Sequence, residues 1–192
     1  TAEQYEDAIE VIGRQAGRRS DLIAQLLQMT RLEQGTQSIS MEQADISSLV
    51  EVICEEQPAL PRGITLQADI QPEIEAWFDV TLMSRLLQNL INNAARYGRE
   101  NGHIWVVLRC VEEEVILSVR DDGIGIPADR LDKIWKRFYQ VESARGAESG
   151  AGLGLTMVRQ IAELHSGTVT VDSREGEGSC FTLRFPVHPH SA

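Results

Sequence analysis

Strand-type and helix-type segments alternate along residues 38–187, which leaves few folds open to this chain. Alternating apolar residues predict strands, whereas helical spacing behind a capping residue such as Asp45 or Asp79 predicts helices. The expected strands cover 38–44, 63–70, 75–78, 103–111, 115–121, 168–173 and 180–187, and the expected helices cover 45–57, 79–97, 129–139 and 152–166. This order favours an α+β fold, a two-layer sandwich of helices on a mixed sheet.

One long helix is expected to precede the sandwich, over residues 1–34, with Gly35 as its stop. One face of this helix carries mostly apolar residues at spacings that alternate between four and three: Tyr5, Ile9, Ile12, Ala16, Arg19, Ile23, Leu26 and Thr30. Such a stripe must be covered, either by the chain's own domain or by pairing in a dimerising helical hairpin. The hairpin is the preferred interpretation, because the stripe is long and starts at the terminus.

The composition excludes several classes of protein. Lys and Arg number 18 against 29 Asp and Glu, a net charge of −11, so neither duplex nucleic acid nor an anionic membrane is an expected partner. Hydrophobic residues make up 42% of the chain, which argues against disorder, yet no apolar run reaches membrane-spanning length. Three widely spaced cysteines (Cys54, Cys110 and Cys180) predict free thiols in a reducing cytoplasm. No secretory leader is recognisable, and the start at Thr1 suggests a fragment.

The strand over 115–121 ends in a carboxylate. Val115, Leu117, Val119 and Asp121 share one face, so Asp121 is expected to point to the apolar side. A buried carboxylate needs hydrogen-bond donors, and the exocyclic amine of adenine would be a suitable one. Gly123 and Gly125 follow directly and would let backbone approach a flat ligand, although a tight turn alone also explains them.

The helix over 79–97 carries a polar stripe beside its apolar one. Asn89, Asn93, Arg96 and Tyr97 are spaced i, i+4, i+7 and i+8. Amide oxygens suit a hard cation such as Mg²⁺ and the phosphates it bridges, and a solvated polar face is the alternative. Further on, Gly150, Gly152 and Gly154 open a helix, where backbone amides can bind phosphate. This segment is no P-loop, because no Gly-Lys-[Ser/Thr] follows.

These segments, in this order, resemble the ATP-binding domain of sensor histidine kinases, members of the GHKL superfamily. The resemblance rests on four sequence boxes between about residues 38 and 186. Residues 89–97 (NLINNAARY) resemble the N box, 121–126 (DDGIGI) the first glycine box, 133–139 (KIWKRFY) the F box and 150–155 (GAGLGL) the second glycine box. Residues 1–35 resemble the second helix of the dimerisation hairpin, and residues 188–192 would be a tail.

The resemblance implies a Bergerat-type sandwich that binds ATP and Mg²⁺ under a lid formed by residues 140–149. Asn93 would bind the metal, Asn89 and Arg96 would act on the phosphates, and Asp121 would accept from the adenine amine. The full implied nucleotide set is Asn89, Asn93, Arg96, Tyr97, Asp121, Gly123, Gly125, Ile126, Phe138, Gly150, Gly152, Leu153, Gly154 and Leu155. Phe138 would anchor the lid.

The same resemblance implies a cytoplasmic domain of a protein anchored in the membrane. Its expected partners are a response regulator receiver domain, the phosphoacceptor helix of the whole protein and a second copy paired through residues 1–34. The phosphoacceptor is absent here, because none of His103, His165, His188 and His190 is followed by the family's Glu-Leu-Arg-x-x-Pro pattern. Gln140 also replaces the usual Arg after the Phe-Tyr pair, so Arg137 or Arg145 would have to contact the γ-phosphate.

Two alternatives to histidine phosphorylation remain. One is an ATP hydrolase of the same superfamily, such as the gyrase, MutL and heat-shock chaperone ATPases. Those enzymes carry a water-activating glutamate four residues before the metal-binding Asn, where this chain has the non-basic Asn89. A histidine nucleophile needs no such base, so Asn89 favours transfer to His. The other alternative is a degenerate nucleotide-binding module, which Gln140 leaves open.

Overall fold

The computed structural model describes residues 23, 26, 27, 30, 39–140 and 152–188. The chain divides into two compact units, Thr1–Ser38 and Ile39–Ala192. In the first unit, Ile23, Leu26, Leu27 and Thr30 are helical, and the Thr30 hydroxyl donates to the Leu26 carbonyl at 2.8 Å. The rest of the helix predicted over 1–34 lies outside the described residues.

The second unit follows the predicted alternation of strands and helices. Its elements are β1 (Glu42–Asp45), α2 (Ile46–Glu55), β2 (Thr65–Ile70), β3 (Glu75–Phe78), α3 (Val80–Tyr97), β4 (His103–Val111), β5 (Glu114–Asp121), α4 (Gly154–Leu164), β6 (Thr168–Arg174) and β7 (Gly178–Pro186). Short 3₁₀ turns lie at Pro61–Gly63 and Ala128–Arg130. The first strand differs most from its predicted bounds of 38–44, because its pairing with β3 begins only at Glu42.

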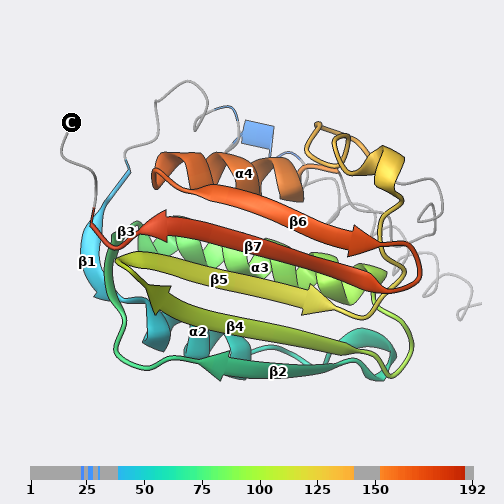
Figure 1. The fold of residues 1–192 in the computed structure, drawn as a ribbon, viewed down its shortest axis with the longest axis horizontal. Helices are drawn as coiled ribbons and strands as arrows, with labels where there is room; N and C mark the ends of the chain where they lie inside the picture. Colours follow the sequence, from blue (N-terminus) through green and yellow to red (C-terminus); the bar gives the residue numbers. More distant parts are fainter. Residues whose placement is uncertain (1–22, 24–25, 28–29, 31–38, 141–151, 189–192) are drawn as a thin grey trace, which may run out of the picture. The chain divides into compact units, whose positions relative to one another are not determined.

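The five-stranded sheet has the order β2-β4-β5-β7-β6. Strand β2 runs parallel to β4 and the other neighbours are antiparallel, so the sheet is mixed as predicted. In Figure 1 the sheet faces the viewer, and α2 and α3 lie behind it. Alternate residues of β4 and β5 point into this core: Ile104, Val106, Leu108, Val115, Leu117 and Val119 are at most 1% exposed.

Both predicted capping residues are confirmed. The Asp45 carboxylate accepts from the amides of Ser47 at 2.8 Å and Ser48 at 3.2 Å, which satisfies donors at the start of α2. Asp79 accepts from the Leu82 amide at 2.9 Å at the start of α3. These two side chains fix where the long helices begin.

The helix predicted over 129–139 is wrong. Only the 3₁₀ turn Ala128–Arg130 forms, and a chain of further turns follows it. Ile134 is the buried member of this stretch, at 6% exposure, and Phe138 has a positive φ of 59°. Helical spacing of Leu131, Ile134, Trp135 and Phe138 therefore does not give a helix, because Ile134 is the one buried side chain of the stretch and the backbone turns at Phe138.

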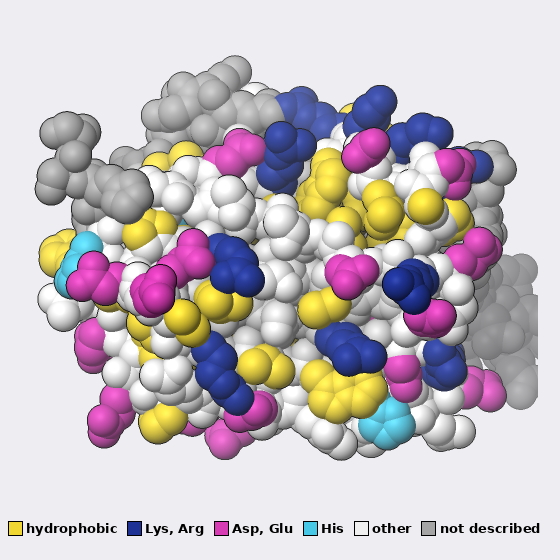
Figure 2. Space-filling view, in the orientation of Figure 1, with side chains coloured by type: hydrophobic (Ala, Val, Ile, Leu, Met, Phe, Trp, Pro, Cys, Tyr) yellow, Lys and Arg dark blue, Asp and Glu magenta, His cyan; other side chains and the backbone are white. Residues whose placement is uncertain are grey.

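The helix-free face of the sheet, toward the viewer in Figure 2, carries acidic and basic side chains side by side. Arg109 pairs there with Asp69, and Arg184 pairs with Glu114 at 3.3 Å. Within the described part of the chain, none of the helices has the length and apolar content needed to cross a membrane. The three cysteines are free and half-buried.

The beginning and end of the second unit meet at one corner. Strand β1 pairs with β3, with Gln43 opposite Trp77. The Trp77 amide donates to the Val187 carbonyl at 2.9 Å, and the Val187 amide donates to the Glu113 carbonyl at 2.8 Å. Backbone hydrogen bonds therefore tie the two-stranded sheet, the end of β7 and the β4–β5 turn together.

A buried histidine joins the end of α4 to the start of α3. His165 is 2% exposed; its Nε2 accepts from the Asp79 amide at 3.0 Å, and its Nδ1 lies 2.7 Å from the Ile161 carbonyl. This geometry assigns the proton to Nδ1, so the ring is neutral. Burial lowers the pKa of His165, and the neighbouring carbonyl and Asp79 oppose that shift only in part.

We expect His165 to make folding sensitive to acid. A lowered folded pKa gives stability that is complete above about pH 6.5 and is lost as the pH falls toward the folded pKa. As the pH is lowered, the unfolding free energy of the unmodified chain should therefore fall more steeply than that of His165→Gln. The two slopes should differ by up to about 1.4 kcal/mol per pH unit. Urea unfolding at half-unit intervals from pH 7.5 to 5 measures both slopes. Parallel curves would contradict the assignment, since Gln keeps an acceptor but cannot titrate.

Candidate functional site

The turn after β5 holds a buried carboxylate. Asp121 is 4% exposed and faces the core, as its position in the strand predicted. Its Oδ1 accepts from the Gly123 amide at 2.8 Å, and the Ser179 amide of β7 is a second donor. Burial raises the pKa of Asp121 to about 6, although both amide hydrogen bonds act to lower it. Asp121 is thus a hydrogen-bond acceptor that is poorly solvated, and an additional donor from a ligand would stabilise its ionised form.

The glycines of this turn are required by the protein's own backbone. A Cβ on Gly123 would overlap the Tyr97 carbonyl, and a Cβ on Gly125, where φ is 67°, would overlap the Arg174 carbonyl. The Ile124 amide donates to the Tyr97 carbonyl at 3.1 Å, and the Ile126 amide donates to the Ser173 hydroxyl at 2.9 Å. The turn is therefore wedged between the end of α3 and the β6–β7 hairpin. The predicted approach of Gly123, Gly125 and Ile126 to a ligand stays a prediction.

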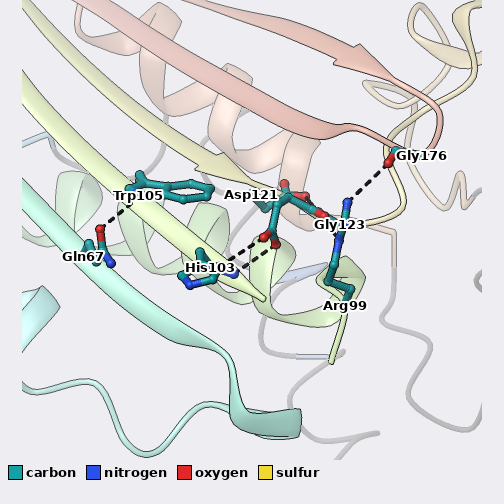
Figure 3. A network of polar contacts seen from close by, with 8 residues as sticks. Gln67, Arg99, His103, Trp105, Asp121, Gly123 and Gly176 are labelled. Carbon is teal, nitrogen blue, oxygen red and sulfur yellow. Dashed lines mark hydrogen bonds and ion pairs between the residues drawn. The ribbon is translucent and has the colours of Figure 1, made fainter. Parts of the chain in front are cut away.

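The turn over residues 122–126, called the glycine turn below, is held in position by side chains from neighbouring strands, as Figure 3 shows. The Asp122 carboxylate accepts from the His103 amide at 2.9 Å and lies 3.2 Å from His103 Nδ1. The His103 ring stacks on Trp105, with 5.5 Å between ring centroids, and Trp105 Nε1 donates to Gln67 at 3.2 Å. Sequence analysis did not single out this group, because the register of β4 beside β5 brings its members together.

Asn89, the first residue of the polar stripe on α3, lies against the start of α4. Asn89 and Asn93 are half-buried, as is Tyr97, whereas Arg96 is exposed. Asn89 Nδ2 lies 3.6 Å from Met157 Sδ, and Asn89 Oδ1 lies 3.4 Å from the place where a Cβ on Gly154 would stand. The missing side chain at Gly154 thus leaves room beside the amide oxygen of Asn89.

Helix α4 begins without a side-chain cap. Leu153, 1% exposed, is its N-cap residue and makes no side-chain hydrogen bond there. Gly154 and Leu155 are its first two residues, and amides in the first turn of a helix are the groups that can bind an anion. Gly152 precedes them with φ of 68°, and its carbonyl accepts from the Phe138 amide at 3.0 Å. Gly150 lies outside the described residues.

Trp135 provides a packed contact of the segment before α4. The Phe138 ring is 60% exposed, and its role as the anchor of the lid stays a prediction, because residues 141–149 of that lid lie outside the described residues. Trp135 meets Phe181 edge to face at 6.1 Å, and its carbonyl accepts from the Thr156 hydroxyl at 3.2 Å.

Three segments therefore come together at one end of the helix layer. They are the glycine turn at the end of β5, the C-terminal half of α3 and the first turn of α4 (Figure 1). They offer a buried carboxylate, amide oxygens and the first backbone amides of α4, which no side chain of the described residues caps. A flat base with an exocyclic amine and a phosphate chain with a cation would match these groups.

Fold and site together define the class of protein. The chain belongs to the family of histidine kinase-, DNA gyrase B- and HSP90-like ATPases, whose pattern matches residues 78–189. Within that family it has the ATP-binding catalytic domain found in sensor histidine kinases. It is 36% identical over 183 residues to sensor histidine kinase RppB of Synechocystis sp., a match that covers 93% of this chain and 40% of RppB.

Solved structures agree on the fold. Full-length ShkA in complex with AMPPNP is 26% identical, with a TM-score of 0.83, and the match covers all of this chain and 40% of ShkA. Histidine kinase ThkA in complex with the response regulator TrrA is 21% identical, with a TM-score of 0.76 over all of this chain and 54% of ThkA, which shows the fold. The chain spans about two fifths of the length of RppB.

Proposed function

We propose that this chain binds ATP and transfers the γ-phosphoryl group to a histidine on another segment of the whole protein. From there the phosphoryl group would pass to a response regulator. The observation that carries the proposal is Asn89, a neutral amide that lies 3.6 Å from Met157 at the start of α4. ATP hydrolases of this family need a glutamate there to activate water, and an amide cannot act as that base. An imidazole acceptor is itself a good nucleophile, so positioning suffices.

The nucleotide would lie across the three segments of the site. The adenine amine would donate to Asp121, with Tyr97 beside the base, and the phosphates would accept from the first amides of α4. Arg96, at the exposed end of α3, would contribute positive charge to the phosphates. The ShkA structure with AMPPNP supports the choice of an ATP-type ligand.

The residues present fit a magnesium ion shared with the phosphates. Magnesium in kinases is held by one or two protein oxygens together with phosphate oxygens. Among the described residues, no cluster of three or more His, Cys, Asp or Glu could form an all-protein metal site. Asn93 on α3 would supply an amide oxygen, and Asn89 would contact the metal–phosphate unit beside the space left by Gly154. When bound, Mg²⁺ would neutralise charge on the phosphates.

The remaining partners follow from the relatives. The ThkA complex with TrrA supports a response regulator as the second acceptor. Residues 1–35 would be the second helix of a dimerisation hairpin, where Ile23 and Leu27 are 57% and 55% exposed. The domain over 38–187 would act on the cytoplasmic side of a membrane-anchored protein.

A transfer assay with the acceptor supplied separately tests the proposal. The chain is incubated with Mg²⁺, ATP labelled at the γ-phosphate and a polypeptide carrying the phosphoacceptor helix of the whole protein. We expect acid-labile label on the acceptor, as phosphohistidine requires. Release of labelled phosphate without transfer would instead indicate an ATP hydrolase. A failure to bind ATP at all would indicate a degenerate module.

Asn93→Ala should weaken ATP binding only when magnesium is present. Its amide oxygen is proposed to touch the metal, so its removal should raise the Kd about tenfold in Mg²⁺ and less than about twofold in EDTA. Calorimetric titration of a non-hydrolysable ATP analogue in both buffers gives the two ratios. Asn92→Ala is the matched control, because Asn92 is exposed on the same helix and bonds to Gln88. Equal losses of affinity in both buffers would mean that Asn93 does not contact the metal.

A further inference from the structure

Arg99 lies just beyond the end of α3 and connects two turns. Its Nε donates to the Asp122 carbonyl, and its Nη2 donates to the Gly176 carbonyl at 3.3 Å in the β6–β7 turn (Figure 3). One planar guanidinium therefore binds both the glycine turn and the hairpin against which that turn packs. The Gly176 amide completes the connection by donating to the Ile124 carbonyl at 2.7 Å.

The carbonyl that Arg99 binds belongs to a peptide group with a second role. The peptide bond between Asp122 and Gly123 also carries the Gly123 amide, which donates to Asp121 Oδ1 at 2.8 Å. In a trans peptide, C=O and N–H point in opposite directions, so a hydrogen bond at one end fixes where the other end points. The guanidinium charge also polarises this peptide and strengthens its N–H as a donor.

The same turn is held from its other side. The Asp122 carboxylate accepts from the His103 amide and lies beside the His103 ring. Burial alone would raise the pKa of Asp122, but the His103 hydrogen bonds and the charge of Arg99 bring it below its ordinary value. The Asp122 carboxylate is therefore an anion held by His103, while the Asp122 carbonyl binds Arg99, and the Asp122–Gly123 peptide cannot rotate without breaking the Arg99 hydrogen bond.

We propose that Arg99 is a positioning residue that orients the Asp121 carboxylate, through the Asp122–Gly123 peptide, for recognition of an adenine-type base. This inference rests on the proposed nucleotide binding. A carboxylate held in one orientation accepts from the 6-amino group of adenine and meets the 6-oxo group of guanine with repulsion. Without Arg99 the peptide can rotate, so the carboxylate loses part of its orientation and the site loses part of its preference for adenine.

The test compares Arg99→Ala with Arg109→Ala. Arg109 makes the same kinds of contact on β4, to the Asp69 carbonyl at 2.9 Å and to the Asp69 carboxylate, but away from the glycine turn. Arg99→Ala should raise the Kd for ADP about tenfold while changing the weak GDP affinity less than about twofold. A lysine can reach one carbonyl at a time, so the Kd of Arg99→Lys for ADP should lie between those of the unmodified chain and Arg99→Ala. Arg109→Ala should change neither value, and equal losses for ADP and GDP would overturn the proposal.

A second measurement needs no nucleotide. The Asp121 carboxyl carbon can be followed by NMR as the chain is titrated with acid. Since the Gly123 hydrogen bond lowers the pKa of Asp121, Arg99→Ala should raise the titration midpoint by about half a pH unit or more, and Arg109→Ala should leave it unchanged. An unchanged midpoint in Arg99→Ala would overturn the positioning role. Lack of ADP binding by the unmodified chain would overturn the proposed function and leave this titration to decide the role of Arg99.

Discussion

Asp121→Asn is expected to abolish adenine nucleotide binding and to leave the fold intact. The Asn carbonyl can still accept from the amides of Gly123 and Ser179, but its NH₂ group would face the adenine amine, donor against donor. Sites built to accept a ligand hydrogen bond lose large factors when the pairing is removed, and we expect a loss of about 100-fold or more. Calorimetric titration with ADP measures it. Affinity within a few-fold of the unmodified chain would exclude Asp121 from the base contact.

The same variant should be more stable than the unmodified chain at alkaline pH. Burial raises the pKa of Asp121 to about 6, so the folded state binds this proton more tightly than the unfolded state. A raised pKa contributes stability that is present below about pH 3.8 and is lost as the pH rises through 6. We compare the unfolding free energy of the Asn variant with that of the unmodified chain. The difference should shift in favour of the variant by about 2 to 3 kcal/mol between pH 4 and pH 8. A buried charge kept at this cost in stability is typical of a functional site.

Gly125→Ala is expected to be the most destabilising small substitution in the second unit. Gly125 has φ of 67°, and a Cβ there would overlap the Arg174 carbonyl and lie 3.1 Å from the Glu175 Cα. Backbone strain and the forced separation of two turns should together cost about 3 to 5 kcal/mol. Urea unfolding followed by tryptophan fluorescence measures the loss.

Gly176→Ala is the matched control for that prediction. Gly176 also has a positive φ, 81°, but a Cβ there would meet no atom within 4 Å. Its substitution should cost about 1 kcal/mol, the conformational penalty alone. Similar losses for the two variants would mean that the glycine turn can move away from the hairpin without penalty.

Much of the fold could be predicted because its signals are local. Strand β4 is a mostly apolar run rich in β-branched residues from His103 to Val111, and Asp79 marks the start of α3. The period of two also predicted that Asp121 faces the core. The helix predicted over 129–139 was wrong, because helical spacing gives no information about whether a neighbouring surface exists to bury the apolar residues.

The site was predictable in its residue types and less so in its geometry. Sequence boxes predicted Asn89, Asn93 and Asp121 as candidate site residues, and the structure brings Asn89 beside Gly154. The support of the site was missed, since Arg99, His103 and Ser179 contact the glycine turn only after the sheet aligns distant strands. Gly123 and Gly125 were interpreted either as room for a flat ligand or as a tight turn, and in the structure they make room for carbonyls of the chain itself.

The corner where the second unit begins and ends has a structural consequence. Gln43 and Val187 both meet β3 at Trp77, at one end of the sheet, whereas the glycine turn and the β6–β7 hairpin lie at the other end (Figure 1). Both connections of the described part of this unit are therefore anchored on the same short backbone ladder, and neither of them touches the glycine turn or the β6–β7 hairpin at the other end of the sheet.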